Sequence, residues 1–316
     1  MSADFYFAVT ITAPIFCILG LGILFKRIAL ITEDFARVGS DLVFKVTLPC
    51  LLFVKLVETD FRQNLPVVLI LYAACATVVV FLLLDQVVTR WIKDTRDRGV
   101  FVQGAFRGNM GIIGLAFCLS AFGDTVVANA SIYLAVITIL FNMLSVMTLS
   151  RHDHRSAGGG HLYQQILLQI IRNPLIIAIT VGIAVSLSGI AIPTLVLTTG
   201  EYFARMTLPL ALLCAGASIR LQEFKGARPL YWAACGKLFL VPLLITSGGI
   251  VIGLRGEELG ILYLMSASPT AAASYPMALS MGGNHHLAAA IIAMTTFGSL
   301  FFTTAGAFVL RACNLI

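Results

Sequence analysis

Charged side chains are scarce in this sequence. Only 11% of its 316 residues are Asp, Glu, Lys or Arg, whereas 59% are hydrophobic, and an ordinary soluble domain carries roughly a quarter charged residues. This balance excludes a soluble enzyme and an intrinsically disordered chain. Because a membrane-spanning helix needs about 20 apolar residues, the composition leaves room for roughly nine or ten spans and little else.

Motifs of metal, nucleotide and disulfide chemistry are also missing. The seven cysteines lie in apolar stretches and show no Cys-x-x-Cys spacing, which argues against a disulfide framework or a structural metal site. The paired histidines at 152 and 154 and at 285 and 286 lack metalloprotease spacing, and no Walker or dinucleotide-binding glycine pattern occurs. We therefore expect no metal, no cofactor and no enzymatic activity.

Apolar runs separated by polar residues predict an all-α integral membrane protein with ten transmembrane helices. Because no basic region precedes the first run and no small-residue cleavage site follows it, we expect a retained helix there. Residues 1–149 hold the first five spans, 150–164 form a cytoplasmic linker, and 165–316 hold the second five. The predicted spans are 5–25, 36–57, 65–89, 99–121, 126–149, 165–189, 195–219, 229–254, 259–281 and 286–310.

The basic residues of the loops predict how these spans are oriented. Thirteen Lys and Arg residues fall in loops on one side of the membrane, whereas the other side holds only Arg62, Arg255 and Arg311. Cytoplasmic loops carry the excess of positive charge, so both termini are predicted outside, in the periplasm, with the chain in the bacterial inner membrane. This asymmetry explains the net charge of +6 without a nucleic-acid partner.

The two halves of the chain resemble each other at a fixed offset of 160 residues. This shift aligns Thr-Leu-Pro at 47–49 with Thr-Leu-Pro at 207–209, and Ala-Ala-Cys at 73–75 with Ala-Ala-Cys at 233–235. Five spans are an odd number, so the second half would enter the membrane from the opposite side. Such inverted repeats are characteristic of secondary transporters, whose substrate sites lie near the midplane. The alternative is an old duplication that is kept for packing alone.

Two spans have compositions that predict a break near their middle. The span at 99–121 carries several glycines around Asn109, and the span at 259–281 carries serines, threonine and prolines around Pro269. Proline removes a backbone donor, and glycine lowers helix propensity by about 1 kcal/mol relative to alanine. Asn109 and Pro269 are themselves 160 residues apart, so spans 4 and 9 are predicted to be broken crossover helices at equivalent positions.

The direction of the broken spans predicts an anion site. Each second half-helix, starting near Gly111 and Ala271, would begin at the midplane, where free N–H groups and a partial positive charge favour an anion. A small carboxylate therefore fits better than a cation. Alternatively, the glycines and prolines only permit tight helix crossing. The side chains of Asn109, Ser268 and Thr270 would add hydrogen bonds, and Gly111, Ala271 and Ala272 would let a ligand approach the backbone.

Basic residues inside the spans are the other candidates, because each costs about 2.5–3.5 kcal/mol at a helix centre. Lys45 follows Asp41, and Arg205 follows Glu201, by four residues, the spacing of an ion pair on one helix face. These pairs either line the transport path or simply pair near a helix start. Lys55 lies close enough to the surface to extend into water.

Arg107 and Lys237 have two interpretations each. Arg107, beside the proposed anion site, would bind a second carboxylate or neutralise the negative end of the first half-helix. Lys237 has no acid within sequence reach, so it would stand in for a coupling cation or carry the proton itself. Asp85, near the cytoplasmic end of its span, is expected to pair with loop bases.

Together these features resemble the auxin efflux carrier family. They comprise the inverted five-helix sets, Thr-Leu-Pro in both second spans, the Gly- and Asn-bearing crossover, and the run SASPTAAASYP at 266–276. The family includes the plant PIN-FORMED auxin exporters and prokaryotic malonate and malate permeases. The resemblance covers essentially the whole chain, without the long central domain of many plant members. By position, it implies crossover residues Asn109, Met110 and Gly111 with Pro269, Thr270 and Ala271.

The resemblance also implies an elevator mechanism. Spans 1, 2, 6 and 7 would form a scaffold, often dimeric, while spans 3–5 and 8–10 move with the substrate. This sequence departs from the plant members at Gly108, where they have proline, and at Pro269, which lacks an adjacent asparagine. It also lacks an acid in the middle of span 3. Lys237 and Asn142 would fill the space behind the crossover instead.

We therefore expect a secondary carrier of small, malonate- or malate-like carboxylates, with the proton and sodium as candidate coupling ions. The expected partners are the organic anion, the lipid bilayer and a second copy in a homodimer. Two alternatives stay open. One is a sodium-coupled carrier of a bulkier organic anion, resembling the bile acid symporters of the same superfamily. The other is a non-transporting membrane sensor.

Overall fold

The computed structural model describes residues 2–58, 66–152, 171–219 and 228–316, and this part of the chain is helical throughout. Most of the predicted linker at 150–164 lies outside these residues. In chain order the segments are α1 (Ser2–Arg27), α2 (Glu33–Leu42), η1 (Val43–Thr47), α3 (Leu48–Val57), α4 (Val67–Trp91), α5 (Thr95–Phe106), η2 (Met110–Gly114), α6 (Leu115–Phe122), η3 (Asp124–Val126), α7 (Val127–His152), α9 (Pro174–Ser188), α10 (Thr194–Ser218), α11 (Arg228–Cys235), η5 (Gly236–Leu240), α12 (Val241–Val251), α13 (Gly256–Ala267), α14 (Ser274–Ser280) and α15 (His285–Ala312).

Polar residues at the helix ends set where the helices begin and stop. Thr32 caps α2 by accepting a hydrogen bond from the Phe35 N–H at 3.1 Å. Asn173 caps α9 in the same way, and Pro174 occupies the first helical position, where no N–H is needed. Gly189 ends α9 in the left-handed conformation that glycine adopts without strain. These short-range signals explain why helices end close to the polar breaks in the sequence.

Several helices are long and apolar enough to cross a membrane. Within the described residues there are five of them, Asp4–Arg27, Val67–Trp91, Asp124–His152, Arg228–Val251 and His285–Ala312, and the shorter Met110–Phe122 and Pro174–Ser188 are also apolar. Large apolar side chains such as Leu71, Val79 and Leu83 of α4 stay exposed on the outer surface. Exposed apolar faces of this kind fit helices that border lipid, so the chain is a multi-pass membrane protein.

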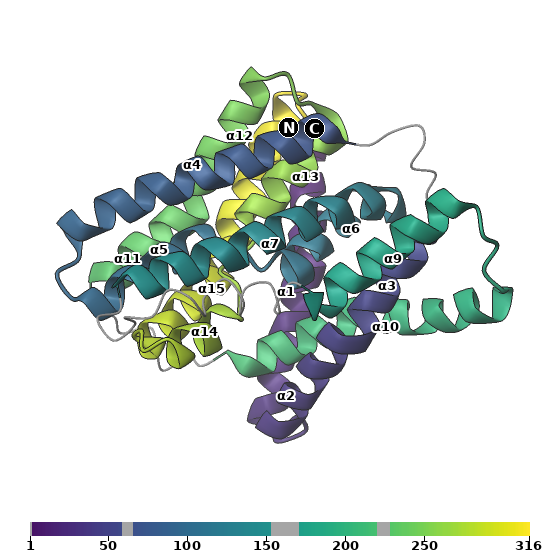
Figure 1. Cartoon of the computed structure of the whole chain (residues 1–316), viewed down its shortest axis with the longest axis horizontal. Coiled ribbons are helices and arrows are strands. Elements are labelled where there is room, and N and C mark those ends of the chain that lie inside the picture. The colour runs from purple at the N-terminus through teal and green to yellow at the C-terminus, as the bar shows by residue number, and fades with distance from the viewer. Residues whose placement is uncertain (1, 59–65, 153–170, 220–227) are drawn as a thin grey trace.

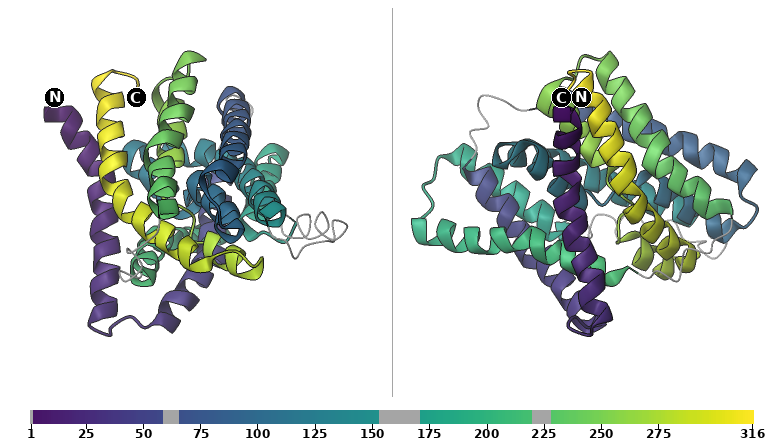
Figure 2. Two further views of the ribbon diagram at one scale, coloured as in Figure 1. Left: turned by 90° about the vertical axis from the view of Figure 1, so that its left-hand side faces the viewer. Right: turned by 180° about the vertical axis from the view of Figure 1, so that it is seen from behind.

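The helices pack in two groups (Figures 1 and 2). In one group, α10 packs against α1, α2 and α3, and α9 packs against α3. In the other group, α4, α5 and α7 pack against one another, α11, α13 and α14 pack against α15, and α12 packs against α13 and α4. The groups meet where α1 contacts α6 and α15 and where α3 contacts α7.

Equivalent glycines bring the helices of the first group into close contact. A Cβ built on Gly22 of α1 would lie 2.3 Å from the Leu213 carbonyl oxygen of α10. A Cβ on Gly182 of α9 would lie 3.4 Å from the Phe53 carbonyl oxygen of α3. Gly22 and Gly182 are 160 residues apart, and so are Phe53 and Leu213. The α1–α10 and α9–α3 contacts therefore use corresponding positions of the two halves.

Replacing Gly216 with alanine is expected to destabilise the protein. The new methyl group would lie 2.1 Å from the Leu19 carbonyl oxygen, and this backbone atom cannot rotate away. Overpacking of this kind costs typically about 1–3 kcal/mol. Thermal unfolding in detergent measures the effect, and Gly20→Ala on α1 is the matched control because its Cβ would meet nothing within 4 Å. Equal melting temperatures for the two variants would contradict the close crossing.

Both termini lie at the same end of the molecule (Figure 2). There the Arg311 guanidinium stacks 4.7 Å from the centre of the Phe7 ring, and the Gly256 N–H donates to the Leu315 carbonyl. The opposite end holds the Lys26–Glu33 ion pair at 3.1 Å. An even number of membrane crossings places two termini together in this way.

Candidate functional site

Two helices are interrupted near their middle, at the places predicted from composition. The helix α5 ends at Phe106, and helical structure resumes at Met110 after Gly108 and Asn109. The helix α13 ends at Ala267, and α14 begins only at Ser274. The expected start of this second half-helix at Ala271 is therefore wrong by three residues. Ala271 instead opens a turn, in which its carbonyl accepts from the Ser274 N–H at 2.9 Å.

The two interruptions pair directly with each other. The Asn109 N–H donates to the Pro269 carbonyl at 2.7 Å, and the Ala271 N–H donates to the Arg107 carbonyl at 3.1 Å. Between these bonds, Gly108 and Thr270 form a short antiparallel bridge. Backbone groups freed from a helix inside a membrane need such partners. Residues predicted to form the crossover, from both halves of the chain, are thus brought together at one point.

Side chains donate hydrogen bonds to backbone carbonyls at the ends of the first half-helices, α5 and α13. At the end of α5, the Thr270 hydroxyl donates to the Gly104 carbonyl at 2.7 Å. At the end of α13, the Ser268 hydroxyl donates to the Met265 carbonyl at 2.7 Å, and the Lys237 ammonium donates to the Ser266 carbonyl at 2.9 Å. Ser268 and Thr270 were predicted to bind the substrate, and in the structure their hydroxyls donate to carbonyls within the crossover.

A cavity of about 310 Å³ adjoins the crossover. On one side it is lined by α2 and α10 of the first helix group. On the other side it is lined by residues at the two interruptions and by α15. Its polar lining comes from Ser40, Asn109, Ser218, Tyr275 and Thr296. The rest of the lining is apolar and consists of Ile112, Ile113, Ala211, Ala215, Ile219, Ala272, Ala289, Ile292 and Ala293. None of the lining residues that the structure describes is charged.

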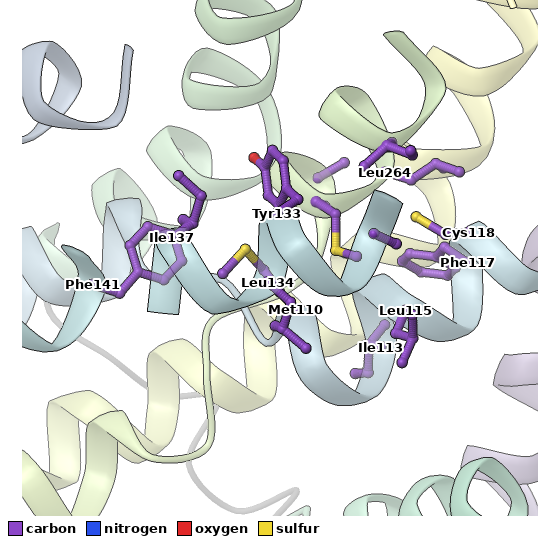
Figure 3. Close-up of a cluster of buried hydrophobic side chains, with 14 of the residues drawn as sticks. Met110, Ile113, Leu115, Phe117, Cys118, Tyr133, Leu134, Ile137, Phe141 and Leu264 are labelled. Atoms are coloured by element: carbon purple, nitrogen blue, oxygen red, sulfur yellow. The ribbon is translucent and has the colours of Figure 1, made fainter. Parts of the chain in front are cut away.

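Among the predicted substrate-site residues, Asn109 is the one that lines this cavity. Met110 is 3% exposed and belongs to the buried apolar cluster with Tyr133 and Leu134 (Figure 3). Pro269, Thr270 and Ala271 form the bridge beside the cavity and are absent from its lining. Ala272, expected to let a ligand approach the backbone, does line it.

The remaining polar lining residues were missed by the sequence analysis. They are Ser40, Ser218, Tyr275 and Thr296, which come from four different helices. They carry no charge and form no pairs under the 160-residue shift. Neither the search for charged residues inside the spans nor the internal repeat therefore indicates them.

Arg107 is 7% exposed and is absent from the cavity lining. Its guanidinium donates to the Asn142 side-chain oxygen at 2.8 Å and contacts the Met277 sulfur at 3.1 Å. The structure thus brings together two predicted residues, Arg107 and Asn142. In this arrangement the guanidinium lies beside the end of α5, where a cation offsets the negative end of the helix dipole.

The predicted ion pairs of the helices form within each helix. The Lys45 ammonium lies 2.7 Å from the Asp41 carboxylate, and the Arg205 guanidinium lies 3.5 Å from that of Glu201. All four side chains are exposed and none lines the cavity. The structure therefore does not bring them to the crossover.

Two further expectations concerned charges near the membrane surfaces. Asp85 is buried and pairs with Arg151, as expected, and it also accepts a hydrogen bond from the Thr148 hydroxyl at 2.8 Å. Lys55 reaches the Asp124 carboxylate at 2.8 Å. Within the described ranges, no group of three or more His, Cys, Asp and Glu side chains is arranged to hold a metal ion.

Comparisons with known proteins identify the family. The family described as membrane transport protein matches residues 7–305. An uncharacterized transporter of Methanocaldococcus jannaschii is 23% identical over 296 residues, 90% of this chain and 90% of the relative. An uncharacterized transporter of Methanothermobacter thermautotrophicus is 22% identical over 287 residues, 89% of this chain and 91% of the relative. Because the family match extends over nearly all of its apolar helices, the chain belongs to the membrane transport protein family, the auxin efflux carriers that its sequence resembles, and is a membrane transporter.

Proposed function

We propose that this protein is a secondary active transporter of small organic anions, in which the cavity beside the crossover binds the substrate. The observation that carries the proposal is the position of Asn109. This residue belongs to the paired interruptions and also lines a cavity that the two helix groups share. Substrate sites at broken helices between two repeats are typical of secondary transporters.

The cavity suits an anion with an apolar body. The first turn of the Met110–Phe122 segment faces it through Ile112 and Ile113, and a helix N-terminus attracts negative charge through its free N–H groups. Among the described residues, however, no basic side chain lines the cavity, and most of the described lining is apolar. These features favour an acid with one carboxylate over the malonate- or malate-like dicarboxylates expected from the sequence.

The proposal includes ten spans in two inverted repeats of five. Three observations support it. The glycine contacts of Gly22 and Gly182 occupy corresponding positions, the bridge is centred on Asn109 and Pro269, which are also 160 residues apart, and both termini lie at one end. With the basic loops inside, the termini face the periplasm and the chain spans the inner membrane.

Alternating access would follow from sliding of the two helix groups. The scaffold comprises α1, α2, α3, α9 and α10, and it would also provide the homodimer contact that the family resemblance implies. The moving group comprises α4–α7 and α11–α15 and carries the crossover. Ser40 of α2 lines the cavity between the groups. The helix α2 lies at the end of the molecule opposite the termini (Figure 1). The structure then corresponds to an inward-facing state.

Uptake into proteoliposomes tests the substrate class. A panel of labelled C2 to C6 mono- and dicarboxylates is expected to show faster uptake of the monocarboxylates. Arg107→Ala is expected to slow both kinds by a similar factor, because the guanidinium contacts Asn142 and Met277 instead of the cavity. A selective loss of dicarboxylate uptake in Arg107→Ala would show that Arg107 binds a second carboxylate. Absence of uptake across the panel would contradict the substrate assignment.

A carrier of a bulkier organic anion is the second candidate, and the apolar lining of the 310 Å³ cavity favours it. Uptake confined to larger, more apolar acids would select this candidate. A membrane sensor would bind the acid in detergent and yet show no uptake in proteoliposomes.

A further inference from the structure

We propose that the Lys237 ammonium is a resident cation of the crossover, which occupies the place of a coupling sodium ion and makes transport independent of sodium. The inference rests on the proposed transport function and specifies its energetics. It concerns a residue outside the cavity, because Lys237 is absent from the cavity lining.

Lys237 is fully buried in the part of the helix bundle that supports the crossover. It sits in η5, the π-helical segment between α11 and α12, and is 1% exposed. A π-helical segment is rare and often marks a functional position. A buried lysine side chain is retained only where it finds polar partners or a function.

The partner of this ammonium is the end of a half-helix. Its Nζ donates to the Ser266 carbonyl at 2.9 Å, one residue before the end of α13. The neighbouring carbonyls are taken by hydroxyls, since Met265 accepts from Ser268 at 2.7 Å and Ala267 accepts from Thr303 at 3.3 Å. In secondary transporters, such half-helix ends and unwound carbonyls are the groups that coordinate sodium or the proton. In this protein the Lys237 ammonium and the hydroxyls of Ser268 and Thr303 already donate hydrogen bonds to the carbonyls at the end of α13.

The ammonium also touches the other half of the crossover. A Cβ built on Gly108 would lie 3.1 Å from the Lys237 Nζ and 2.5 Å from the Ser268 Oγ. The cation is therefore packed against both interruptions at once, next to the residue that precedes Asn109. A positive charge at this position offsets the negative end of α13 and adds to the attraction for an anion beside Asn109.

In the part of the chain that the structure describes, no acidic side chain forms an ion pair with this ammonium. Among the described residues, the ion pairs of the protein involve other bases, and none includes Lys237. A sodium site built from carboxylates is likewise not found among them, since they contain no cluster of acidic or other metal-binding side chains. The charge on Lys237 is thus balanced by the helix end and, on binding, by the substrate anion.

Two readouts test the resident cation. In proteoliposomes, wild-type uptake is expected to be unchanged when choline replaces sodium on both sides. Lys237→Met, which keeps the length and removes the charge, is expected to lower uptake about tenfold or more, the change expected for loss of a hydrogen bond to a charged group. Lys45→Met is the matched control, since Lys45 lies in an exposed ion pair away from the crossover, and its uptake should stay near that of the wild type.

Thermal unfolding in detergent supplies the second readout and needs no substrate. The wild type should melt at the same temperature in sodium and in choline, whereas Lys237→Ala, which vacates the space of the ammonium, should melt higher in sodium or lithium. Sodium-dependent uptake or melting of the wild type overturns the proposal, and so do wild-type uptake rates in Lys237→Met. It is also overturned if a pH gradient accelerates uptake by the wild type but not the residual uptake by Lys237→Met, because Lys237 would then carry the proton. If the wild type transports no acid, the proposed function fails, and the melting comparison still tests the resident cation.

Discussion

Replacing Asn109 with alanine is expected to weaken transport strongly and to leave the protein folded in the membrane. Asn109 lines the cavity, and the 2.7 Å bond to the Pro269 carbonyl comes from its backbone N–H, which alanine keeps. The substitution therefore removes the polar lining group and preserves the bridge. A hydrogen bond to a charged ligand contributes about 1.5–3 kcal/mol, so affinity should fall roughly ten- to a hundredfold.

Uptake at a substrate concentration near the wild-type KM measures this effect. Asn129→Ala is the matched control, because Asn129 also donates a side-chain hydrogen bond, to Glu257 at 3.2 Å, and is absent from the cavity lining. The control should transport normally. Wild-type affinity in Asn109→Ala, with normal folding, would remove the cavity from the transport path.

Replacing Gly108 with alanine is expected to disrupt the crossover itself. The new methyl group would lie 2.5 Å from the Ser268 Oγ, 3.1 Å from the Lys237 Nζ and 3.3 Å from the Met265 carbonyl oxygen. Separating these groups would break the bonds that satisfy the end of α13, at a cost of about 1–3 kcal/mol for overpacking. Both the melting temperature and the transport rate should fall.

Gly111→Ala supplies the comparison, since its Cβ would lie 3.5 Å from the nearest atom, on Leu48. This ordinary van der Waals distance predicts an unchanged melting temperature. A transport defect confined to Gly111→Ala, without loss of stability, would indicate that substrate approaches the backbone at Gly111. If Gly108→Ala is as stable and active as the wild type, the packing described around Gly108 is incorrect.

The sequence predicted those features that depend on neighbouring residues. The interruptions follow from the local chemistry of Gly108 and Pro269, because glycine and proline weaken any helix that contains them. Capping at Thr32 and Asn173 also acts within a few residues, although neither cap was predicted. For the same reason the Asp41–Lys45 and Glu201–Arg205 pairs formed as their spacing indicated.

Features that depend on packing between distant segments could not be predicted in this way. Ser40 and Ser218 line the cavity because α2 packs against α10, and nothing in their local sequence indicates that contact. The start of α14 at Ser274 depends on a turn closed by the Ala271 carbonyl. Arg107 was placed correctly at the end of the first half-helix, but its contacts with Asn142 and Met277 come from two other helices.

Counterflow tests the central claim most directly. Proteoliposomes are loaded with unlabelled acid and diluted into trace labelled acid, with no sodium, proton or voltage gradient. A carrier with alternating access predicts transient accumulation of label in wild-type vesicles, and far less in vesicles that contain Asn109→Ala. Binding of the acid by the wild type in detergent, with no accumulation of label in vesicles, would contradict the claim that this cavity carries an organic anion across the membrane.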